Sequence, residues 1–577
     1  MSEAMAVTMP PMRAPALVAM LVVVLVALVR RRRHRSKGAG GRLESLPPGP
    51  VGLPVIGNMH QMLVNKPVFR WVHRLLADAG GEIVCVRLGP VHVVAVTSPE
   101  MAREVLRKND AVFADRPTTF AAESFSVGYR SASISPHGDQ WRKMRRVLTA
   151  EILSPATEHR LRGARGEEAD HLVRYVLVRC GRDGAAVDVR HVARHFCGNV
   201  IRRLTLGRRH FREPRADDED AAAPGRDEAE HVDALFATLN YLDAFCVSDY
   251  FPALVGLDLD GQEKVIKKVM RTLNRLHDPV VEERVEEWRL LRKAGERRDV
   301  ADFLDVLASL DDAAGRPLLT VEEIKAQTIL QIENCVVCMH LIFTTFTIYL
   351  GTWPSVISTD IMIATVDNPS NAVEWALAEM MNKPEVMRKA MDELDTVVGR
   401  DRLVQESDVR DLNYLKACIR EAFRLHPYHP FNPPRVAMAD TTIAGYTIPK
   451  GSQVILSRVG LGRNPRVWDD PLEFRPERHL SPYPAGGRGD AGVVALTEAE
   501  LRFVSFSTGR RGCPGVSLGT LITVTLFARL LQGFEWSKPA GVERVELREE
   551  AASLVLAQPL VLQATPRLAA HLYGAGK

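Results

Sequence analysis

The chain has 577 residues, of which 46% are hydrophobic and 25% charged, proportions typical of a globular protein with a large core rather than of a disordered or fibrous one. Its 75 lysines and arginines against 71 acidic residues leave a formal charge of only +4, which favours no nucleic-acid partner. Eight cysteines are too few and too scattered for a disulfide scaffold, and they indicate a reduced, cytosol-facing protein in which one thiol has a special task.

The N-terminal region predicts a membrane anchor. Residues 14–29 are almost wholly aliphatic, and a helix of about 16 residues spans roughly 24 Å, slightly short of the ~30 Å bilayer core. The basic run Arg30–Arg33 follows this stretch instead of preceding it, which argues against a cleaved signal peptide and places the protein body in the cytosol. We expect a lumenal leader over residues 1–13, a transmembrane signal anchor over 14–29, and a basic, proline-rich hinge over 30–65.

Helical patterns dominate the rest of the chain. Residues 99–109 and 367–381 have helical periodicity, whereas the valine-rich runs 82–88 and 92–97 alternate and predict short strands. This balance predicts a mainly α fold with small β-sheets rather than a doubly wound α/β fold. The polar stretches 212–231 and 481–492 are predicted to be surface loops.

Three short patterns resemble known sites but lack the context that those sites need. The GxGxxG pattern at 487–492 has no strand before it, and the GxSxG pattern at 515–519 follows Arg-Arg-Gly-Cys-Pro instead of an apolar strand. Cys335 and Cys338 have no second pair of ligands at zinc spacing. We therefore expect no dinucleotide site, no serine nucleophile and no zinc site at these positions.

The run 506–515 carries the strongest chemical signal. Cys513 is framed by Gly509, Gly515 and Arg511, so a tight loop can point backbone amides and a cation at the sulfur. Both features favour a thiolate that binds a metal. A buried inert cysteine would explain Cys513 alone, but not its surroundings.

This run resembles the haem-binding signature FxxGxRxCxG of the cytochrome P450 family, and it matches at Phe506, Gly509, Arg511, Cys513 and Gly515. The resemblance covers nearly the whole chain and implies a cytochrome P450 haem domain over residues 66–577, with heme b held by the Cys513 thiolate. It also implies a structural network and a set of haem-propionate contacts. The network residues are Glu421, Arg424 and Arg478, and the further haem contacts are Trp141, Arg145, Arg435 and Arg511.

The family resemblance also implies partners and a location. Electrons are expected from a separate NADPH–cytochrome P450 reductase, with Arg142, Lys143 and Arg510 as a docking patch. The expected location is the endoplasmic reticulum membrane, crossed once, with the catalytic domain in the cytosol.

Most of the family has an acid followed by threonine in the long helix over the haem, but here Asp367 is followed by Asn368 and Pro369. This stretch, with the segments 430–433 (PFNP) and 505–513 (SFSTGRRGC), is similar to the plant amino-acid N-monooxygenases. Those enzymes use O2 to convert an amino acid to its aldoxime by two N-hydroxylations, dehydration and decarboxylation, in cyanogenic glucoside or defence metabolism. The resemblance implies tyrosine, or else phenylalanine, as substrate.

Within this family reading, Asp367 and Asn368 are expected to deliver protons. Arg130 is a candidate partner of the substrate carboxylate, and Phe431 and Asn432 are candidate substrate contacts. Two alternatives stay open: a cytochrome P450 that hydroxylates carbon in a terpenoid, fatty acid or phenolic, and an inactive haem protein.

The second alternative comes from residues 330–360, where the family likeness is interrupted. The stretch 335–359 contains no Asp, Glu, Lys or Arg and resembles a membrane span. One additional crossing would put the two halves of the haem domain on opposite sides of the membrane. We therefore interpret 330–360 as an insertion or a retained intron.

Overall fold

The structure is a computed structural model, and it describes residues 45–180, 186–209, 247–258, 261–331, 363–480, 492–551 and 553–574. The predicted leader and membrane anchor lie outside these ranges, as do the predicted loop 212–231 and nearly all of 330–360 and 481–492.

Helices account for most of the described chain. In chain order they are α2 (Met59–Val64), α3 (Val68–Asp78), α4 (Pro99–Arg103), α5 (Phe120–Phe125), α6 (Asp139–Val147), α7 (Pro155–Arg160), α8 (Arg162–Cys180), α9 (Val189–Leu206), α11 (Val247–Tyr250), α12 (Gln262–Ala294), α13 (Phe303–Ser309), α14 (Val321–Gln331), α15 (Ile363–Asn382), α16 (Pro384–Val397), α17 (Asn413–Leu425), α18 (Arg458–Gly462) and α19 (Val516–Gly533). Two π-helical turns, η1 (Glu104–Lys108) and η2 (Leu148–Ile152), extend α4 and α6.

The strands are short and form three small sheets. They are β1 (Ile83–Leu88), β2 (Val91–Val96), β3 (Val187–Asp188), β4 (Arg435–Val436), β5 (Thr441–Ile443), β6 (Tyr446–Ile448), β7 (Gln453–Leu456), β8 (Phe534–Ser537) and β9 (Val561–Pro566). The largest sheet has the order β1-β2-β7-β4, in which β2 and β7 are parallel and the other pairs antiparallel. The prediction of a mainly α fold with small sheets is confirmed.

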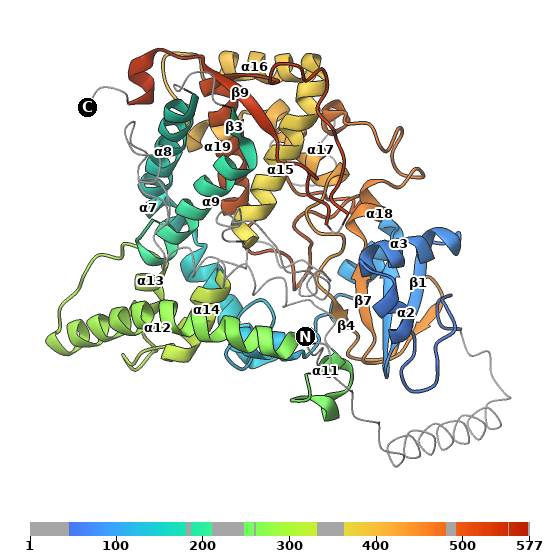
Figure 1. Ribbon diagram of the computed structural model, residues 1–577. Coiled ribbons are helices and arrows are strands. Elements are labelled where there is room, and N and C mark those ends of the chain that lie inside the picture. The colour runs from blue at the N-terminus through green and yellow to red at the C-terminus, as the bar shows by residue number, and fades with distance from the viewer. Residues whose placement is uncertain are drawn as a thin grey trace, which may run out of the picture.

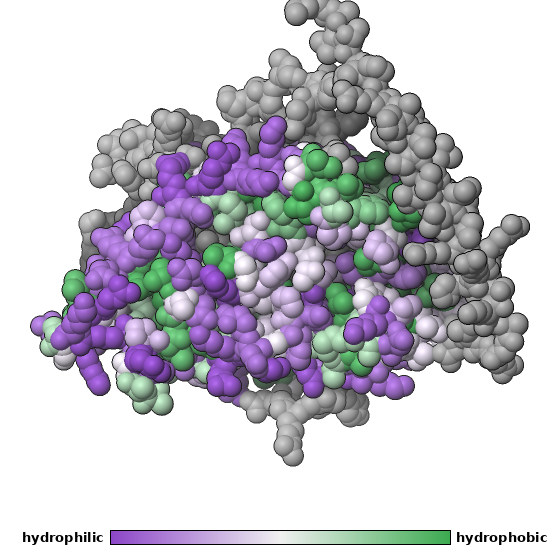
Figure 2. Space-filling view, turned by 90° about the horizontal axis from the view of Figure 1, so that it is seen from below, coloured by the Kyte–Doolittle hydropathy of each residue, from purple (hydrophilic) through white to green (hydrophobic). Residues whose placement is uncertain are grey.

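The largest sheet lies at one side of the molecule with α2 and α3, while α8, α9 and α12 lie at the other side (Figure 1). Helices α15, α17 and α19 run between them, and α15 packs against α9, α17 and α19. The sequence predictions at 82–88, 92–97, 99–109 and 367–381 correspond to β1, β2, α4 with η1, and α15. Figure 2 shows the underside of the molecule in the view of Figure 1, where hydrophilic side chains dominate and hydrophobic ones form small groups.

Among the described residues, one helix, α19, is long and apolar enough to cross a membrane by length and composition. The apolar window of α19 is 78% buried inside the structure, and its side chains belong to the largest hydrophobic core. We therefore assign α19 to the core. Its N-terminus begins three residues after Cys513, so this core fixes one end of the cysteine loop.

Candidate active site

The loop that carries Cys513 is closed by its own backbone. The Cys513 N–H donates to the Phe506 carbonyl at 2.8 Å, and the Gly512 N–H donates to the Gly509 carbonyl at 2.9 Å. The buried Phe506 ring meets Phe423 of α17 edge to face, with 5.9 Å between ring centres. The cysteine loop is thus anchored on α17 before the signature and on α19 after it.

Gly509 is required by this geometry. Its φ of +77° is a conformation that side chains with a Cβ rarely adopt, and a Cβ there would lie 2.3 Å from the Asp110 Oδ1. Asp110 approaches closely because its carboxylate accepts from the Arg510 backbone N–H at 3.1 Å and from the Arg435 guanidinium at 3.0 Å. The glycine in the signature therefore makes room for a buried carboxylate.

Arg145 of α6 reaches the cysteine loop. Its guanidinium donates to the Gly512 carbonyl at 2.6 Å, one residue before the cysteine. Burial lowers the pKa of Arg145, and the charge of Cys513 opposes that shift, which places the cation within electrostatic reach of the sulfur. A positive charge close to a cysteine favours the thiolate form of that cysteine.

Arg435 and Arg511 are also held against the loop. Arg435 is 2% exposed and donates to the Thr508 carbonyl at 2.9 Å. Arg511 donates to the carbonyls of Ala114 at 2.7 Å and Ser135 at 2.9 Å. The structure thus brings Arg145, Arg435 and Arg511 together around one loop.

This group of cations is suited to an anion. Burial, together with the charges of Arg116, Arg435 and Arg145, lowers the pKa of Arg511 to about 8. Guanidinium groups keep their protons in proteins, so a buried cation among other cations is suited to a negative partner. The buried Trp141 Nε1 has no hydrogen-bond partner among the described residues. A donor without an acceptor beside clustered guanidinium groups fits the two propionates of a haem.

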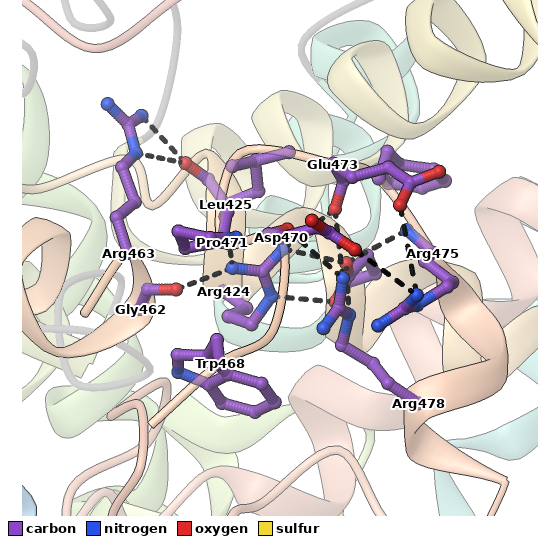
Figure 3. Close-up of polar contacts among 12 residues, drawn as sticks. Arg424, Leu425, Gly462, Arg463, Trp468, Asp470, Pro471, Glu473, Arg475 and Arg478 are labelled. Atoms are coloured by element: carbon purple, nitrogen blue, oxygen red, sulfur yellow. Dashed lines mark hydrogen bonds and ion pairs between the residues drawn. The ribbon is translucent and has the colours of Figure 1, made fainter. Parts of the chain in front are cut away.

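The predicted structural network is assembled on α17. Glu421 and Arg424 are both 0% exposed, and the Arg424 guanidinium donates to both carboxylate oxygens of Glu421 at 2.8 and 2.7 Å. Arg478 donates to the same carboxylate at 3.0 Å. Figure 3 shows the Arg424 guanidinium above the Trp468 ring, 5.1 Å from its centre, among backbone carbonyls that include Gly462 and Pro471. A buried cation satisfied on all sides is a packing element, in agreement with its predicted structural role.

Sequence reasoning missed a third partner of Glu421. The His479 Nε2 lies 2.8 Å from the second carboxylate oxygen, and burial lowers the pKa of this histidine to about 4. Burial alone would raise the pKa of Glu421, but the hydrogen bonds and charge from Arg424 and His479 outweigh it and lower that pKa to about 2. The only signal in the sequence was the place of His479 directly after Arg478.

Helix α15 presents two buried amides one turn apart. Asn368 is 6% exposed and Asn371 is 5% exposed, and Asn371 donates to the His426 carbonyl at 3.2 Å. The Asn368 Nδ2 and the Asn371 Oδ1 have no partner among the described residues. Pro369 between them removes one backbone donor from the helix. This turn therefore has free polar groups in an apolar setting; the Asp367 side chain lies outside the described part.

The three candidate substrate residues have different surroundings. Arg130 is exposed after α5. Phe431 is 1% exposed and stacks on His73 of α3, with 5.0 Å between ring centres, so its ring is occupied by core packing. Asn432 is 2% exposed and accepts from Arg458 at 2.9 Å. The positions of Phe431 and Asn432 explain both as internal contacts, so the structure adds no support to their expected substrate role.

The predicted docking cations all have carboxylate partners. Arg142 pairs with Asp139, Lys143 pairs with Glu323 at 2.8 Å, and the half-exposed Arg510 pairs with Asp110 at 2.9 Å. These pairs reduce the positive field that the sequence suggested.

Ser517 of the GxSxG pattern lies in the first turn of α19. Its hydroxyl donates to the carboxylate of Glu158 at 2.8 Å, whereas a nucleophilic serine donates to a general base that activates it.

The family model described as cytochrome P450 matches residues 47–332 and 355–563. A tyrosine N-monooxygenase of Sorghum bicolor is 58% identical over 93% of this chain and 89% of its own length. A tryptophan N-monooxygenase of Arabidopsis thaliana is 48% identical over 92% and 89%, and a phenylalanine N-monooxygenase of Prunus mume is 46% identical over 96% and 98%. A zebrafish cytochrome P450 solved with abiraterone has a TM-score of 0.61 at 22% identity, covering 87% of this chain and 100% of that one, which shows the fold.

Proposed function

The chain belongs to the cytochrome P450 family and, within it, to the amino-acid N-monooxygenases, and we propose that it hydroxylates the amino nitrogen of an aromatic L-amino acid twice to give the aldoxime. Tyrosine is the first candidate and phenylalanine the second. The observation that carries this choice is the 58% identity to the sorghum tyrosine enzyme over 93% of the chain. The product class is a precursor of cyanogenic glucosides or other defence compounds.

The cofactor in this proposal is heme b, whose iron the Cys513 thiolate would bind. When bound, the thiolate-ligated haem activates O2 and supplies the oxidising power of the reaction. Arg145 and the closed backbone of the cysteine loop hold the loop in place, and the nearby cation favours the deprotonated form of the sulfur. Arg435 and Arg511 would neutralise the propionates, and the Trp141 Nε1 would donate a hydrogen bond to one of them.

Proton delivery is assigned to the turn around Pro369. The Asn368 Nδ2 and the Asn371 Oδ1, which have no partner within the described part of the chain, can hold ordered water, because a buried water needs two to four polar partners. Asp367 precedes them in the same helix and is the acid of the relay. An amide at 368 instead of a hydroxyl keeps a hydrogen-bond donor and acceptor at that place, and like a hydroxyl it does not ionise near neutral pH.

A separate NADPH–cytochrome P450 reductase is the proposed electron donor, and residues 14–29 are the proposed anchor in the endoplasmic reticulum membrane. The aliphatic composition of 14–29 and the basic run after it support this topology. Since Arg142, Lys143 and Arg510 are paired with carboxylates, we expect the docking of the reductase to depend on these residues only weakly.

Residues 330–360 remain a proposed insertion or retained intron. The family match stops at residue 332 and resumes at 355, which supports an interruption of the family sequence. Helix α14 ends at Gln331 and α15 begins at Ile363, so the interruption lies between two described helices. Sequencing the transcript is the test: a message that encodes 330–360 without a break would contradict the intron, and a shorter message would support it.

The proposed activity is tested by co-expressing the full chain with a plant reductase and supplying a panel of amino acids. Oxime from tyrosine, with less from phenylalanine, is the expected result. Oxidation only of terpenoids, fatty acids or phenolics would indicate a carbon hydroxylase instead. Absence of a thiolate-haem spectrum in the reduced CO complex would indicate an inactive haem protein.

A further inference from the structure

Two segments that carry the resemblance to N-monooxygenases meet in the structure. Asn432 of the segment 430–433 is 2% exposed, and its Nδ2 donates to the Ser507 Oγ at 3.4 Å. Ser507 belongs to the segment 505–513 that ends at Cys513. The Asn432 side chain is thus in contact with the cysteine loop and is held inside the protein.

Arg458 completes this contact. It is 5% exposed in the first turn of α18, and its Nε donates to the Asn432 Oδ1 at 2.9 Å while its Nη2 donates to the Ser505 carbonyl at 3.1 Å. Its own backbone N–H donates to the Pro430 carbonyl at 2.9 Å. One buried guanidinium therefore joins the segment before β4 to the start of the cysteine loop.

Asn432 and Arg458 contact Ser507 and Ser505, two residues that determine the backbone conformation of the cysteine loop. Ser507 has a φ of +57°, which is uncommon for a residue with a Cβ and persists only where neighbouring contacts hold it. The carbonyl of Phe506, which lies between Ser505 and Ser507, accepts a hydrogen bond from the Cys513 N–H at 2.8 Å. A change in the backbone at 505–507 would therefore move the backbone at Cys513.

Asn432 and the residue before Arg458 are themselves hydrogen-bonded to the largest sheet. The Asn432 backbone N–H donates to the Leu456 carbonyl at 2.9 Å, at the end of β7 in the largest sheet. The Ser457 N–H donates to the Val96 carbonyl at 2.8 Å in β2, and the Ser457 Oγ lies 2.6 Å from the His73 Nε2. Arg458 thus connects the largest sheet to the cysteine loop, so that the place of the loop depends on the place of the sheet.

We propose that Asn432 and Arg458 are positioning residues that tie the cysteine loop to the largest sheet and so set the place of the Cys513 sulfur. This inference rests on the proposed role of Cys513 as the haem ligand. Hydrogen bonds next to a metal-bound thiolate affect the reduction potential of the metal group and the affinity of the protein for it. The position of the loop that carries the thiolate affects both as well.

The test compares the full-length holoprotein with Asn432→Leu, Asn432→Asp, Arg458→Lys and Ser507→Ala. Asn432→Leu removes the side-chain hydrogen bonds to Ser507 and from Arg458 at similar volume, and Asn432→Asp keeps the acceptor for Arg458 but loses the donor to Ser507. Asn382→Leu is the matched control, because Asn382 also makes two hydrogen bonds, to both backbone groups of Val545, away from the loop. The readouts are the thiolate fraction of the reduced CO complex, the reduction potential, the rate of haem loss and the affinity for tyrosine.

Asn432→Leu is expected to raise the rate of haem loss about fivefold or more and to shift the potential, as the loss of a hydrogen bond to a buried charged group predicts. Ser507→Ala should give a smaller shift in the same direction, and the double variant with Asn432→Leu should add little, since Asn432→Leu already breaks the Asn432–Ser507 contact. Asn382→Leu should leave the spectrum and the potential unchanged.

The inference is overturned if Asn432→Leu and Arg458→Lys keep the wild-type spectrum, potential and haem-loss rate, or if only their tyrosine affinity falls. The spectrum, potential and haem-loss rate need no amino acid. A wild-type protein with a thiolate-haem spectrum but no oxime would therefore contradict the proposed function alone, and the positioning role would still be decided by the variants.

Discussion

The guanidinium carbon of Arg511 lies 4.3 Å from the centre of the Trp141 ring, so the cation two residues before Cys513 is stacked on a tryptophan from α6. The contact fixes both side chains beside the cysteine loop and leaves the Trp141 Nε1 as a buried donor without an acceptor among the described residues. The contact joins helix α6 to the signature around Cys513, two segments that lie far apart in the sequence.

The Trp141 donor supplies the first prediction. Trp141→Phe keeps a ring under Arg511 but removes the N–H, and we expect haem loss to become about fivefold faster, the effect of about 1 kcal/mol from one hydrogen bond. Haem transfer to an excess of an apo-globin measures the rate. Trp536→Phe is the control, because its Nε1 donates to the Leu530 carbonyl at 3.0 Å instead. Equal rates for Trp141→Phe and the wild type would contradict the propionate role.

The second prediction concerns the glycine of the signature. Gly509→Ala should reduce the yield of thiolate-haem protein strongly, because its Cβ would lie 2.3 Å from the Asp110 Oδ1 in addition to the strain of a positive φ. Gly451→Ala is a matched control with a φ of +84° and no atom within 4 Å of the added Cβ. We expect the control to lose only about 1 kcal/mol of stability. Similar losses in the two variants would show that the close approach of Asp110 is unimportant.

The third prediction separates a buried ion pair from an exposed one of the same spacing. Arg424→Met leaves Glu421 as a buried charge without its main partner, and we expect a loss of about 3–5 kcal/mol of folding free energy and little holoprotein. Arg289→Met breaks an equivalent pair with Glu286, exposed by 52% and 49%, and should cost less than about 0.5 kcal/mol. Urea unfolding measures both. A fully stable Arg424→Met would refute the structural role of the network.

The fourth prediction follows from His479. Burial lowers its pKa to about 4 from the ordinary value of 6.5, so between these values the unfolded chain binds a proton that the folded chain does not. The free energy of unfolding therefore falls as the pH drops from 6.5 to 4, by at most about 1.4 kcal/mol per pH unit for this group. The pH dependence of the urea midpoint measures the effect. In His479→Gln this slope should be smaller, and an unchanged slope would contradict the assignment.

The sequence predicted the parts of the site that local spacing determines. Glu421 and Arg424 share a face of a helix at i and i+3, and the cysteine loop is contiguous, so both could be recognised without a structure. The helices and strands at 82–109 and 367–381 followed from periodicity, which acts over a few residues.

Contacts between distant segments could not be predicted in this way. Asn432 and Ser507 are 75 residues apart, and Asp110 is 325 residues from Arg435, so no spacing rule relates them. For the same reason the hydrogen bond from Arg458 to Asn432 could not be expected from the sequence. The carboxylate partners of Arg142, Lys143 and Arg510 likewise depend on how helices pack, which charge counting does not reveal.

The measurement that tests the central claim most directly is the fate of isotopes in tyrosine. The full chain with reductase is supplied with tyrosine that carries heavy nitrogen at the amino group and heavy carbon at the carboxyl group. We expect a product that keeps the nitrogen label and has lost the carboxyl label as carbon dioxide, and that is absent with Cys513→Ala. A product that keeps both labels and gains oxygen on carbon would contradict N-hydroxylation.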